Sequence, residues 1–389
     1  MRLSSDTTAA VHHSGGTIVI QVRSLVAAAA AALAAATTTL GVSPATTATA
    51  APPTPGEGWY LTTIEHGRPG PYGIVADRQR LVLVSPDGHR TRLLDQPARK
   101  AGRLVDWSPD GSVALLVSQD EKHPQATRVD VTTGDTTVLP LPTDVADVVL
   151  APDGDGVLAV AYQDEHSDQA PLSEITWDGT RTTISDDVDG PVLPSPNGDS
   201  LVTHGASWHA KVIRVLSTSE GTVLQKVRTP THCLPVRWWD DQRVLVDCSA
   251  KKGTTTLSLV DVHAGTVTPL TGRTDPQPED LGHLDARRID SGLYVQVAGP
   301  CGYVYLGRQH HGRVTQVRVP GAVGNVLLID GSGSRLTLEH AISCDGATPR
   351  SALTRFDPVT KKERTLVLLP KREAFGTVLP YGERRATGF

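Results

Sequence analysis

The chain has 389 residues, with 37 Lys or Arg against 42 Asp or Glu, so its formal net charge is −5 at neutral pH. This mildly acidic balance argues against a nucleic acid as partner, because binding a phosphate backbone needs a clustered basic surface. A charge of this size suits solubility and says little else about function.

The N-terminus has the pattern of a signal peptide. After Arg23 comes an alanine-rich apolar stretch of about a dozen residues, which is too short to span a bilayer. Ala48-Thr49-Ala50 fits the small-x-small rule of signal peptidase. We therefore predict a signal peptide over residues 1–50 and a linker over 51–58. The mature protein is then secreted and does not insert into a membrane. The alternative interpretation is an alanine-rich tail on a cytosolic protein.

A tight turn before a short strand rich in Arg, Thr and Val recurs seven times, at a spacing of about 45 residues. The seventh copy, near Thr360, lacks glycine, and the other six contain Gly88, Gly134, Gly179, Gly221, Gly265 and Gly312. A repeat of this length, filled with short strands, is typical of a β-propeller with four-stranded blades.

A second series of turns alternates with the first. Pro109-Asp110-Gly111 recurs as Pro152-Asp153-Gly154 and Pro196-Asn197-Gly198, and each copy precedes an apolar strand. Proline, Asp or Asn and glycine are the residues that hairpin turns require. The sequence thus predicts an all-β fold, a seven-bladed β-propeller of four-stranded antiparallel blades, with six or eight blades as the alternative. The predicted repeats are 59–97, 101–142, 144–187, 189–230, 232–274, 281–320 and 324–370, with a closing strand at 375–381.

The first repeat is the one that lacks a clear innermost strand. Its predicted strands are Gly73–Asp77, Leu81–Ser85 and His89–Leu94. The last strand of the chain, Thr377–Leu379, has no blade of its own, so pairing the two ends would close the ring and remove exposed sheet edges. Trp59–Ile64 is the alternative for the innermost position.

These repeats resemble the WD40-like repeats of TolB-type propellers. The residues that carry the likeness are Trp107-Ser108-Pro109-Asp110-Gly111, Val129–Gly134 and the hairpin Leu83–Gly88. The resemblance covers residues 60–385 and implies a seven-bladed propeller with a protein-binding role. We expect no counterpart of the additional N-terminal domain of the periplasmic Tol component, and therefore not its specific translocation role.

Four cysteines in an exported chain suggest two disulfides. If Asp240-Asp241 forms the centre of a hairpin, Cys233 falls opposite Cys248, at a separation that a disulfide tolerates. Cys301 and Cys344 lie one repeat apart, so a bridge between them would join neighbouring blades. The alternative is a Cys/His metal site with His232 or His340, although the Cys-x-x-Cys spacing of zinc sites is absent.

Within each blade we name the strands a to d from the centre outwards. The b–c and d–a loops open on one face, where propellers usually bind ligands. Two b–c loops repeat an Asp-Glu pair next to a histidine and the third contains an aromatic residue. The candidate binding residues on this face are Asp120, Glu121, His123, Asp164, Glu165, His166, Trp208 and His209. The alternative is that these polar loops are only solvated.

The starts of the a strands supply a second set of candidates, at the mouth of the central channel: Arg103, Asp147, Arg237, His283, Asp285 and Arg287. A ring of mixed charge could hold a small anion or a peptide terminus. It could equally consist of ion pairs that line a wet channel.

Catalytic motifs are missing from the sequence. There is no Gly-x-Ser-x-Gly elbow, no His-Glu-x-x-His pair, no P-loop and no dinucleotide fingerprint. We therefore assign no catalytic residue, no metal ligand and no cofactor. We predict a monomeric, exported, non-catalytic propeller that binds a protein, peptide or envelope component through its loop face. The alternative is a secreted hydrolase or lyase of lactones or glycans, with a divalent cation such as calcium at the channel mouth.

Overall fold

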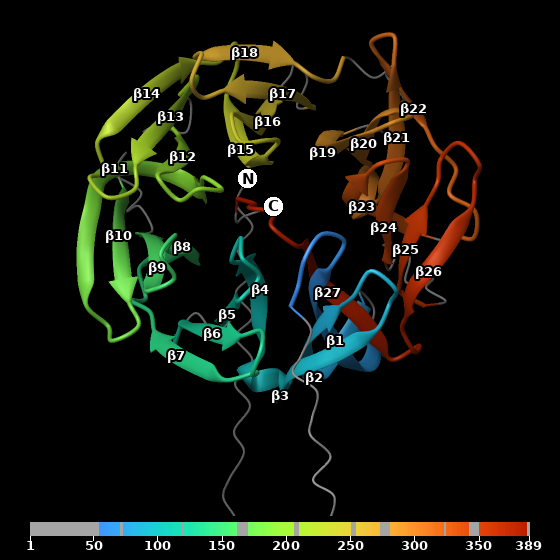
Figure 1. The fold of residues 1–389 in the computed structure, drawn as a ribbon, viewed down its shortest axis with the longest axis horizontal. Coiled ribbons are helices and arrows are strands. Elements are labelled where there is room, and N and C mark those ends of the chain that lie inside the picture. The colour runs from blue at the N-terminus through green and yellow to red at the C-terminus, as the bar shows by residue number, and fades with distance from the viewer. Residues whose placement is uncertain are drawn as a thin grey trace, which may run out of the picture. The chain divides into compact units, whose positions relative to one another are not determined.

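Strands make up nearly all of the regular structure in this computed structural model, which describes residues 54–70, 73–118, 120, 122–161, 170–205, 210–249, 254–272, 281–322, 324–341 and 350–386. These residues belong to one unit, Ala51–Phe389. In this unit seven four-stranded antiparallel blades form a ring (Figure 1). The predicted all-β, seven-bladed fold is confirmed.

The first half of the ring contains blades 1 to 4. Blade 1 combines β27 (Glu373–Pro380), β1 (Tyr60–Gly70), β2 (Gly73–Val84) and β3 (Arg90–Pro97), and the short 3-10 helix η1 (Ala98–Lys100) follows it. Blade 2 contains β4 (Gly102–Trp107), β5 (Val113–Ser118), β6 (Gln125–Asp130) and β7 (Thr136–Pro140). Blade 3 contains β8 (Val145–Leu150), β9 (Gly156–Ala161), β10 (Ala170–Thr176) and β11 (Arg181–Pro194), and blade 4 adds β12 (Ser200–His204), β13 (Val212–Ser217) and β14 (Val223–Arg228).

The second half contains blades 5 to 7. Blade 5 consists of β15 (Cys233–Trp238), β16 (Arg243–Ser249), β17 (Thr255–Asp261) and β18 (Thr266–Pro269). Blade 6 consists of β19 (Gly282–Ile289), β20 (Gly292–Ala298), β21 (Val304–His310) and β22 (Arg313–Gln316), with the 3-10 helix η3 (Pro300–Gly302) before β21. Blade 7 consists of β23 (Asn325–Ser332), β24 (Arg335–Ala341), β25 (Ala352–Phe356) and β26 (Glu363–Leu368).

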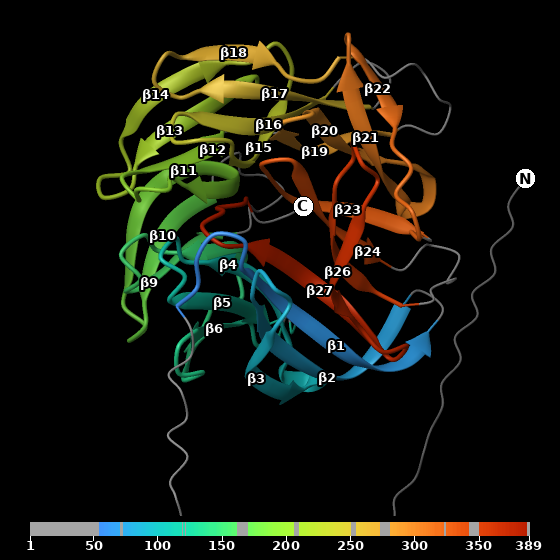
Figure 2. The same ribbon diagram turned by 45° about the vertical axis from the view of Figure 1, so that its right-hand side comes forward.

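Blade 1 closes the ring by pairing the two ends of the domain. β27 is its innermost strand and lies antiparallel to β1, with Tyr60 opposite Pro380 (Figure 2). The predicted bounds of the neighbouring strands were wrong. Gly73–Asp77 and Leu81–Val84 belong to one continuous strand, β2, and Ser85 follows its end. The predicted closing strand is innermost, and the alternative, Trp59–Ile64, lies at the start of β1, the second strand of the blade. The long β1–β2 hairpin places both segments on a single extended strand.

β11 is shared by two blades. Its first part pairs with β10 as the outermost strand of blade 3, and its last part pairs with β12 as the innermost strand of blade 4. The predicted boundary between repeats, at residue 188, therefore falls inside one strand. Gly190, with φ of +73°, lies where the register shifts between the two pairings.

The hydrophobic core is divided among the seven contacts between neighbouring blades. Leu115 of blade 2 packs with Val148 and Ala159 of blade 3, for example, and Leu306 of blade 6 packs with Leu328 of blade 7. The alternation of side chains along each strand allows a blade to bury one apolar face against each neighbour. Most of the interior strands therefore read as nearly continuous apolar runs.

The recurring turns have the backbone that their residues predict. Gly88 has φ of +92°, and a Cβ at this position would lie 2.4 Å from the carbonyl oxygen of Leu366 in blade 7. The glycine-less seventh turn reaches the same left-handed conformation with Lys361, whose φ is +60°. Glycine is favoured at such positions because it has no Cβ.

One disulfide is present among the described residues. Cys233 and Cys248 face each other in the β15–β16 pair and are bonded, with their Cα atoms 4.0 Å apart. This is the pair that the hairpin register predicts. Cys344 lies outside the described residues, so the expected Cys301–Cys344 bridge stays a prediction.

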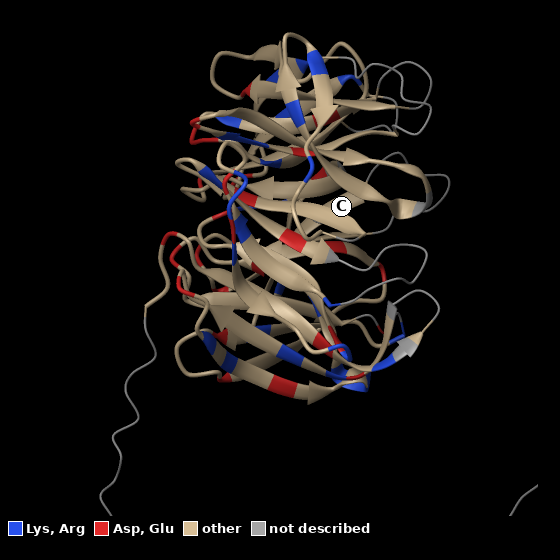
Figure 3. Cartoon of the chain, turned by 90° about the vertical axis from the view of Figure 1, so that its right-hand side faces the viewer, with Lys and Arg blue, Asp and Glu red and all other residues tan. Residues whose placement is uncertain are grey.

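Basic and acidic residues are mixed over the side of the ring that Figure 3 shows, without a continuous basic surface. Among the described residues no helix has the length and apolar character needed to cross a membrane.

Candidate functional site

The innermost strands share a bulge that is followed by a charged residue. The register shifts by one residue within β4, β8, β15, β19 and β23. The residues that directly follow these bulges are Asp106, Asp147, Arg237, Asp285 and Asp330. Bulges commonly redirect side chains next to functional sites. Here they place a charged residue at the same position of five innermost strands.

The four aspartates share one local contact. In each, Oδ1 accepts a hydrogen bond from the next backbone amide, at distances of 2.9 Å for Asp106, 3.0 Å for Asp147, 2.7 Å for Asp285 and 2.7 Å for Asp330. This contact fixes the carboxylate and leaves Oδ2 free to face a neighbour. The partner of Oδ2 therefore distinguishes the four positions.

The C-terminal segment, residues 381–386, runs into the middle of the ring after β27 (Figure 2). Its backbone adds to the inner edge of blade 5: the amide of Ala386 donates to the carbonyl of Val236 at 2.8 Å, and Arg237 and Arg385 form an isolated bridge. The segment thus contacts strands on the far side of the channel from its own blade.

This segment forms a buried ion-pair network with blades 5 and 6. Glu383 binds Arg287 with both carboxylate oxygens, at 2.6 and 2.8 Å. Asp285 receives Nε of Arg237 at 3.0 Å and Nη2 of Arg385 at 3.2 Å. Burial acts to raise the pKa of Asp285 and of Glu383, but the surrounding arginines outweigh it and hold both pKa values below their usual range. Both carboxyl groups are therefore charged.

Blade 2 is tied to the same segment through Asp106. Its Oδ2 binds Nη1 of Arg384 and also accepts the amide of Leu150, from blade 3, at 3.0 Å. Asp106 and Arg384 are almost completely buried. One C-terminal segment therefore pairs with charged groups on blades 2 and 6 and adds its backbone to blade 5.

The candidates for the channel mouth divide into two groups. Arg237, Asp285 and Arg287 lie inside the ion-pair network with exposures of 4 to 6%. His283 is fully buried, and its Nδ1 lies 2.9 Å from Oγ1 of Thr271. These four side chains are occupied by contacts within the protein. The other two candidates, Arg103 and Asp147, line a cavity.

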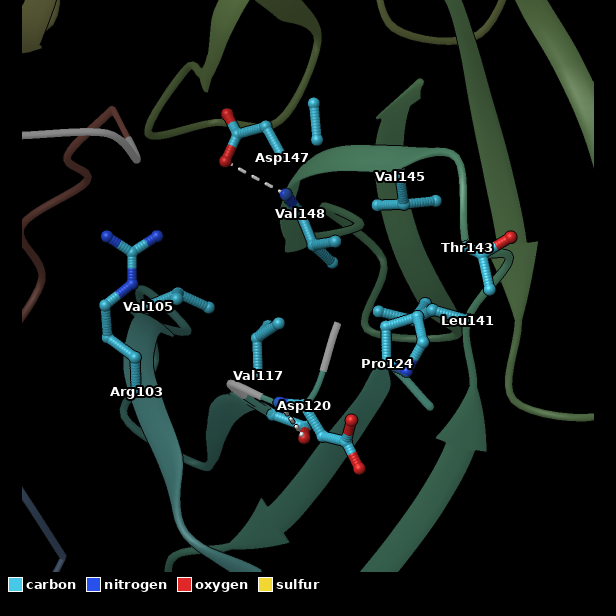
Figure 4. A pocket seen from close by; sticks show the side chains of 12 residues that line it. Arg103, Val105, Val117, Asp120, Pro124, Leu141, Thr143, Val145, Asp147 and Val148 are labelled. Carbon is cyan, nitrogen blue, oxygen red and sulfur yellow. Dashed lines mark hydrogen bonds between the residues drawn. The ribbon is translucent and has the colours of Figure 1, made fainter. Parts of the chain in front are cut away.

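This cavity, of about 340 Å³, lies between blades 2 and 3 (Figure 4). The start of β4 supplies Arg103, the start of β8 supplies Asp147, and Asp120 comes from the b–c loop of blade 2. Arg103 is exposed and Asp147 is half-buried. The apolar part of the wall consists of Val105, Val117, Pro124, Leu141, Val145 and Val148. The cavity opens on the face of the b–c and d–a loops, because its residues come from the starts of a strands and from these loops.

Asp147 differs from the other three aspartates in the hydrogen bonding of its Oδ2 atom. This atom has no hydrogen-bond partner among the described residues, whereas the Oδ2 atoms of Asp106 and Asp285 bind arginines. Burial raises the pKa of Asp147 to about 7, although the backbone amides of Val148 and Val192 and the charge of Arg103 lower it. Asp147 can therefore gain or lose a proton near neutral pH and can accept or donate a hydrogen bond.

Of the eight binding residues predicted in the b–c loops, the structure describes two, Asp120 and His123. Asp120 accepts the amide of Lys122 at 3.0 Å, which is the main reason why its pKa is lowered, and His123 lies 3.4 Å from its Oδ2. The side chains of Asp120 and His123 are exposed. The remaining candidates, Glu121, Asp164, Glu165, His166, Trp208 and His209, lie outside the described residues.

Solved structures with similar folds were found at low sequence identity. A puromycin-hydrolyzing peptidase of Mycobacterium tuberculosis matches with a TM-score of 0.52 and 19% identity, over 82% of this chain and 53% of that one. A prolyl endopeptidase matches with a TM-score of 0.51 and 12% identity, over 82% of this chain and 51% of that one. TolB of Acinetobacter baumannii has a TM-score of 0.48 and 14% identity, over 84% of this chain and 68% of that one.

These matches concern the fold alone. The chain is a seven-bladed β-propeller. It spans about half the length of the two peptidases. No protein-family profile matches the propeller sequence, and no curated protein matches it.

Sequence reasoning missed the C-terminal segment as a part of the centre. Glu383, Arg384 and Arg385 come two residues after the last strand, and this run of three charged residues is the signal that the sequence offers. The sequence also gives no sign that Asp106 belongs to the centre. It directly precedes the Trp107–Gly111 motif, which predicts only a turn. Among the described residues no group of three His, Cys, Asp or Glu side chains is arranged to hold a metal ion.

Proposed function

We propose that this protein is an exported, non-catalytic β-propeller that binds a peptide, a protein or another envelope component through the face of its b–c and d–a loops. The cavity between blades 2 and 3 is the proposed contact site. The observation that carries the proposal is the pair Arg103 and Asp147, which face this cavity while the other charged residues of the channel are neutralised internally.

The cavity suits a segment of polypeptide. Arg103 can donate hydrogen bonds to a carbonyl or carboxylate, and Asp147 can accept one from an amide or amine. The apolar wall formed by Val105, Val117 and Leu141 can receive a small side chain. Ligand sites commonly combine a mainly apolar wall with a few polar groups in this way.

Support for export comes from two features of different kind. The Cys233–Cys248 disulfide fits an oxidising compartment. The apolar stretch after Arg23 and the Ala48-Thr49-Ala50 site fit a cleaved leader. Fractionation of expressing cells, with N-terminal sequencing of the product, tests this part: an uncleaved protein in the cytosol would contradict it.

Capture of a partner from the secreted and envelope fractions tests the binding site. We expect the double variant Arg103→Ala/Asp147→Ala to lose at least about tenfold in affinity for the captured partner, since charged hydrogen bonds contribute about 1.5–3 kcal/mol each. Asp240→Ala/Arg243→Ala is the matched control, because it removes an exposed ion pair from a turn of blade 5. Equal binding by the two variants would refute the cavity as the binding site.

The second candidate function is a secreted hydrolase or lyase of lactones or glycans. Asp147 favours it, because a carboxyl group with a pKa of about 7 can act in general acid–base catalysis. Asp285, also considered for a cation at the mouth, is bound to arginines. Turnover of a lactone or glycan by the wild type, abolished in Asp147→Asn, would favour this function over binding. Metal analysis of the purified protein tests for calcium.

A further inference from the structure

A second cavity, of about 310 Å³, lies on the opposite face of the ring, where blade 7 meets blade 1. Its residues come from the turn ends of the strands: Tyr60 begins β1, Asp330 lies near the end of β23, and Arg335 begins β24. This cavity lies at the seam where the ring closes. It shares no residue with the cavity between blades 2 and 3.

Two arginines of blade 7 line this cavity, and neither forms an ion pair with another described residue. Arg335 is exposed and forms no ion pair or hydrogen bond with the described residues. Arg355 is half-buried. Its guanidinium donates to the carbonyl of Gly58 at a long 3.5 Å, and its charge and a hydrogen bond act on the Tyr60 hydroxyl and lower the pKa of that group, against the larger effect of burial. Paired guanidinium groups with free N–H donors are suited to a carboxylate or phosphate group.

The cavity also presents hydrogen-bond acceptors and hydroxyls next to the arginines. The Tyr60 hydroxyl lies 2.7 Å from Oγ1 of Thr337 and donates to Oδ2 of Asp330 over a long 3.4 Å. Oδ1 of Asp330 accepts the Gly331 amide, so Oδ2 can accept a further hydrogen bond. At the rim Glu57 accepts from Ser332 at 3.0 Å. A ligand of this cavity therefore needs donors as well as a negative charge.

We infer that the seam cavity, defined by Tyr60, Asp330, Arg335, Thr337 and Arg355, binds a small carboxylic acid that also carries hydrogen-bond donors. The carboxylate binds the two guanidinium groups, and a hydroxyl or ammonium group binds Asp330. The volume lies at the lower end of the range for small-molecule sites, which favours a molecule of monosaccharide or amino-acid size. Uronic acids and free amino acids share this chemistry.

A ligand bound to Asp330, Arg335 and Arg355 of blade 7 would also lie against Tyr60 of blade 1, which lines the same cavity. It would therefore stabilise the closed ring, because a ligand that binds only the folded state raises the free energy of unfolding. Thermal unfolding is thus a readout of binding that is independent of any partner at the loop face.

The test uses the mature protein with D-glucuronate, L-alanine, D-glucose and acetate, in thermal unfolding and in ligand-observed NMR titrations. We expect glucuronate or alanine to raise the melting temperature and to bind more tightly than glucose, which lacks the carboxylate, and acetate, which lacks the donors. Which of the two binds identifies the source of the ligand. Binding should be at least about tenfold weaker in Arg335→Gln and in Arg355→Gln.

Arg364→Gln is the matched control. Arg364 also reaches across the seam, to the carbonyl of Asp87 at 3.2 Å, but it does not line the cavity. Because Arg335 is exposed, its variant keeps the test valid if Arg355→Gln folds poorly. Equal binding of glucose, or unchanged binding in Arg335→Gln, would overturn the inference, as would the absence of binding by both acids at 10 mM, roughly ten times a millimolar dissociation constant. Arg103→Ala/Asp147→Ala should bind the acid normally, so the two proposals can fail separately.

Discussion

Glu383, six residues before the end of the chain, holds Arg287 of β19 with both of its carboxylate oxygens, at 2.6 and 2.8 Å. The two residues are 96 positions apart in the sequence. Their ion pair joins the C-terminal segment, which follows the closing strand of blade 1, to the wall of blade 6. Closure of the ring therefore has two parts, the β27–β1 pairing and the ion pairs in the channel.

Glu383→Ala should strongly destabilise the domain. The substitution leaves Arg287 buried at 6% exposure beside Arg237 and Arg385, with Asp285 as the one acid among the described residues that forms ion pairs with all three. Removing one partner of a buried ion pair costs about 3–5 kcal/mol. Urea denaturation measures this loss. The exposed Glu220→Ala is the control and should change the free energy of unfolding by less than about 0.5 kcal/mol. A loss of under 1 kcal/mol in Glu383→Ala, as for a surface pair, would contradict the prediction.

The Cys233–Cys248 disulfide should stabilise the domain by constraining the unfolded chain. The two cysteines are 15 residues apart, and closing a loop of this length contributes about 3 kcal/mol. The measurement uses Cys301→Ala/Cys344→Ala, in which this is the only disulfide that can form. Reductant should lower its free energy of unfolding by about that amount.

The variant in which all four cysteines are replaced by alanine is the control for the disulfide. Its free energy of unfolding should not respond to reductant. A similar response of the two variants would show that the reductant acts elsewhere and that the disulfide contributes little.

Local turn chemistry explains how much of the fold could be predicted. The Pro-Asp-Gly turns require specific backbone angles, so their spacing indicated the blades, and the hairpin register placed Cys233 opposite Cys248. The strand boundaries of the first repeat and the continuous β11 were not predicted. A polar segment such as Val75–Arg80 gives no local sign that the strand continues through it, because pairing with β1 holds it extended.

For the candidate site, the sequence predicts which residues lie near the channel but not which of them pair with one another. Sequence position alone placed Arg237, Asp285 and Arg287 at the channel with Arg103 and Asp147. It could not show that Glu383 binds Arg287 or that Arg385 joins Arg237 on Asp285, since both contacts depend on where the segment after β27 runs. Long-range ion pairs leave no periodic pattern in a sequence. Arg103 and Asp147 differ from the other channel-mouth candidates because those form contacts within the protein, and this difference is visible only in the structure.

Lys361→Gly should stabilise the seventh outer turn. Lys361 has φ of +60°, a conformation that costs a residue with a Cβ about 1 kcal/mol and costs glycine little. We expect a gain of up to about 1 kcal/mol, reduced by the loss of the contact between Nζ and the Phe356 ring at 5.7 Å. Thermal unfolding measures it. Lys362→Gly, at a position without a positive φ, should give no gain. Equal effects of the two variants would contradict the conformational explanation.

Glu339 of β24 is a buried acid with no partner among the described residues. It is 3% exposed, its cross-strand neighbours are Leu327 and Leu353, and no ion pair or hydrogen bond to its carboxylate exists in the described part of the chain. Burial raises its pKa to about 8. Between its ordinary pKa of 4.5 and pH 8 the folded protein keeps a proton that the unfolded chain has lost. The free energy of unfolding therefore falls as the pH rises through this window.

Glu339→Gln should remove this loss, because glutamine has nearly the same shape and no proton to release. At pH 5 the variant and the wild type should be similarly stable, and at pH 8.5 the variant should be more stable by on the order of a few kcal/mol. Denaturation at a series of pH values gives the difference between the two proteins. Glu220→Gln, at an exposed position, should differ from the wild type by the same small amount at every pH. A difference for Glu339→Gln that stays constant from pH 5 to 8.5 would show that Glu339 is charged in the folded protein, and hence that a cation or water compensates it.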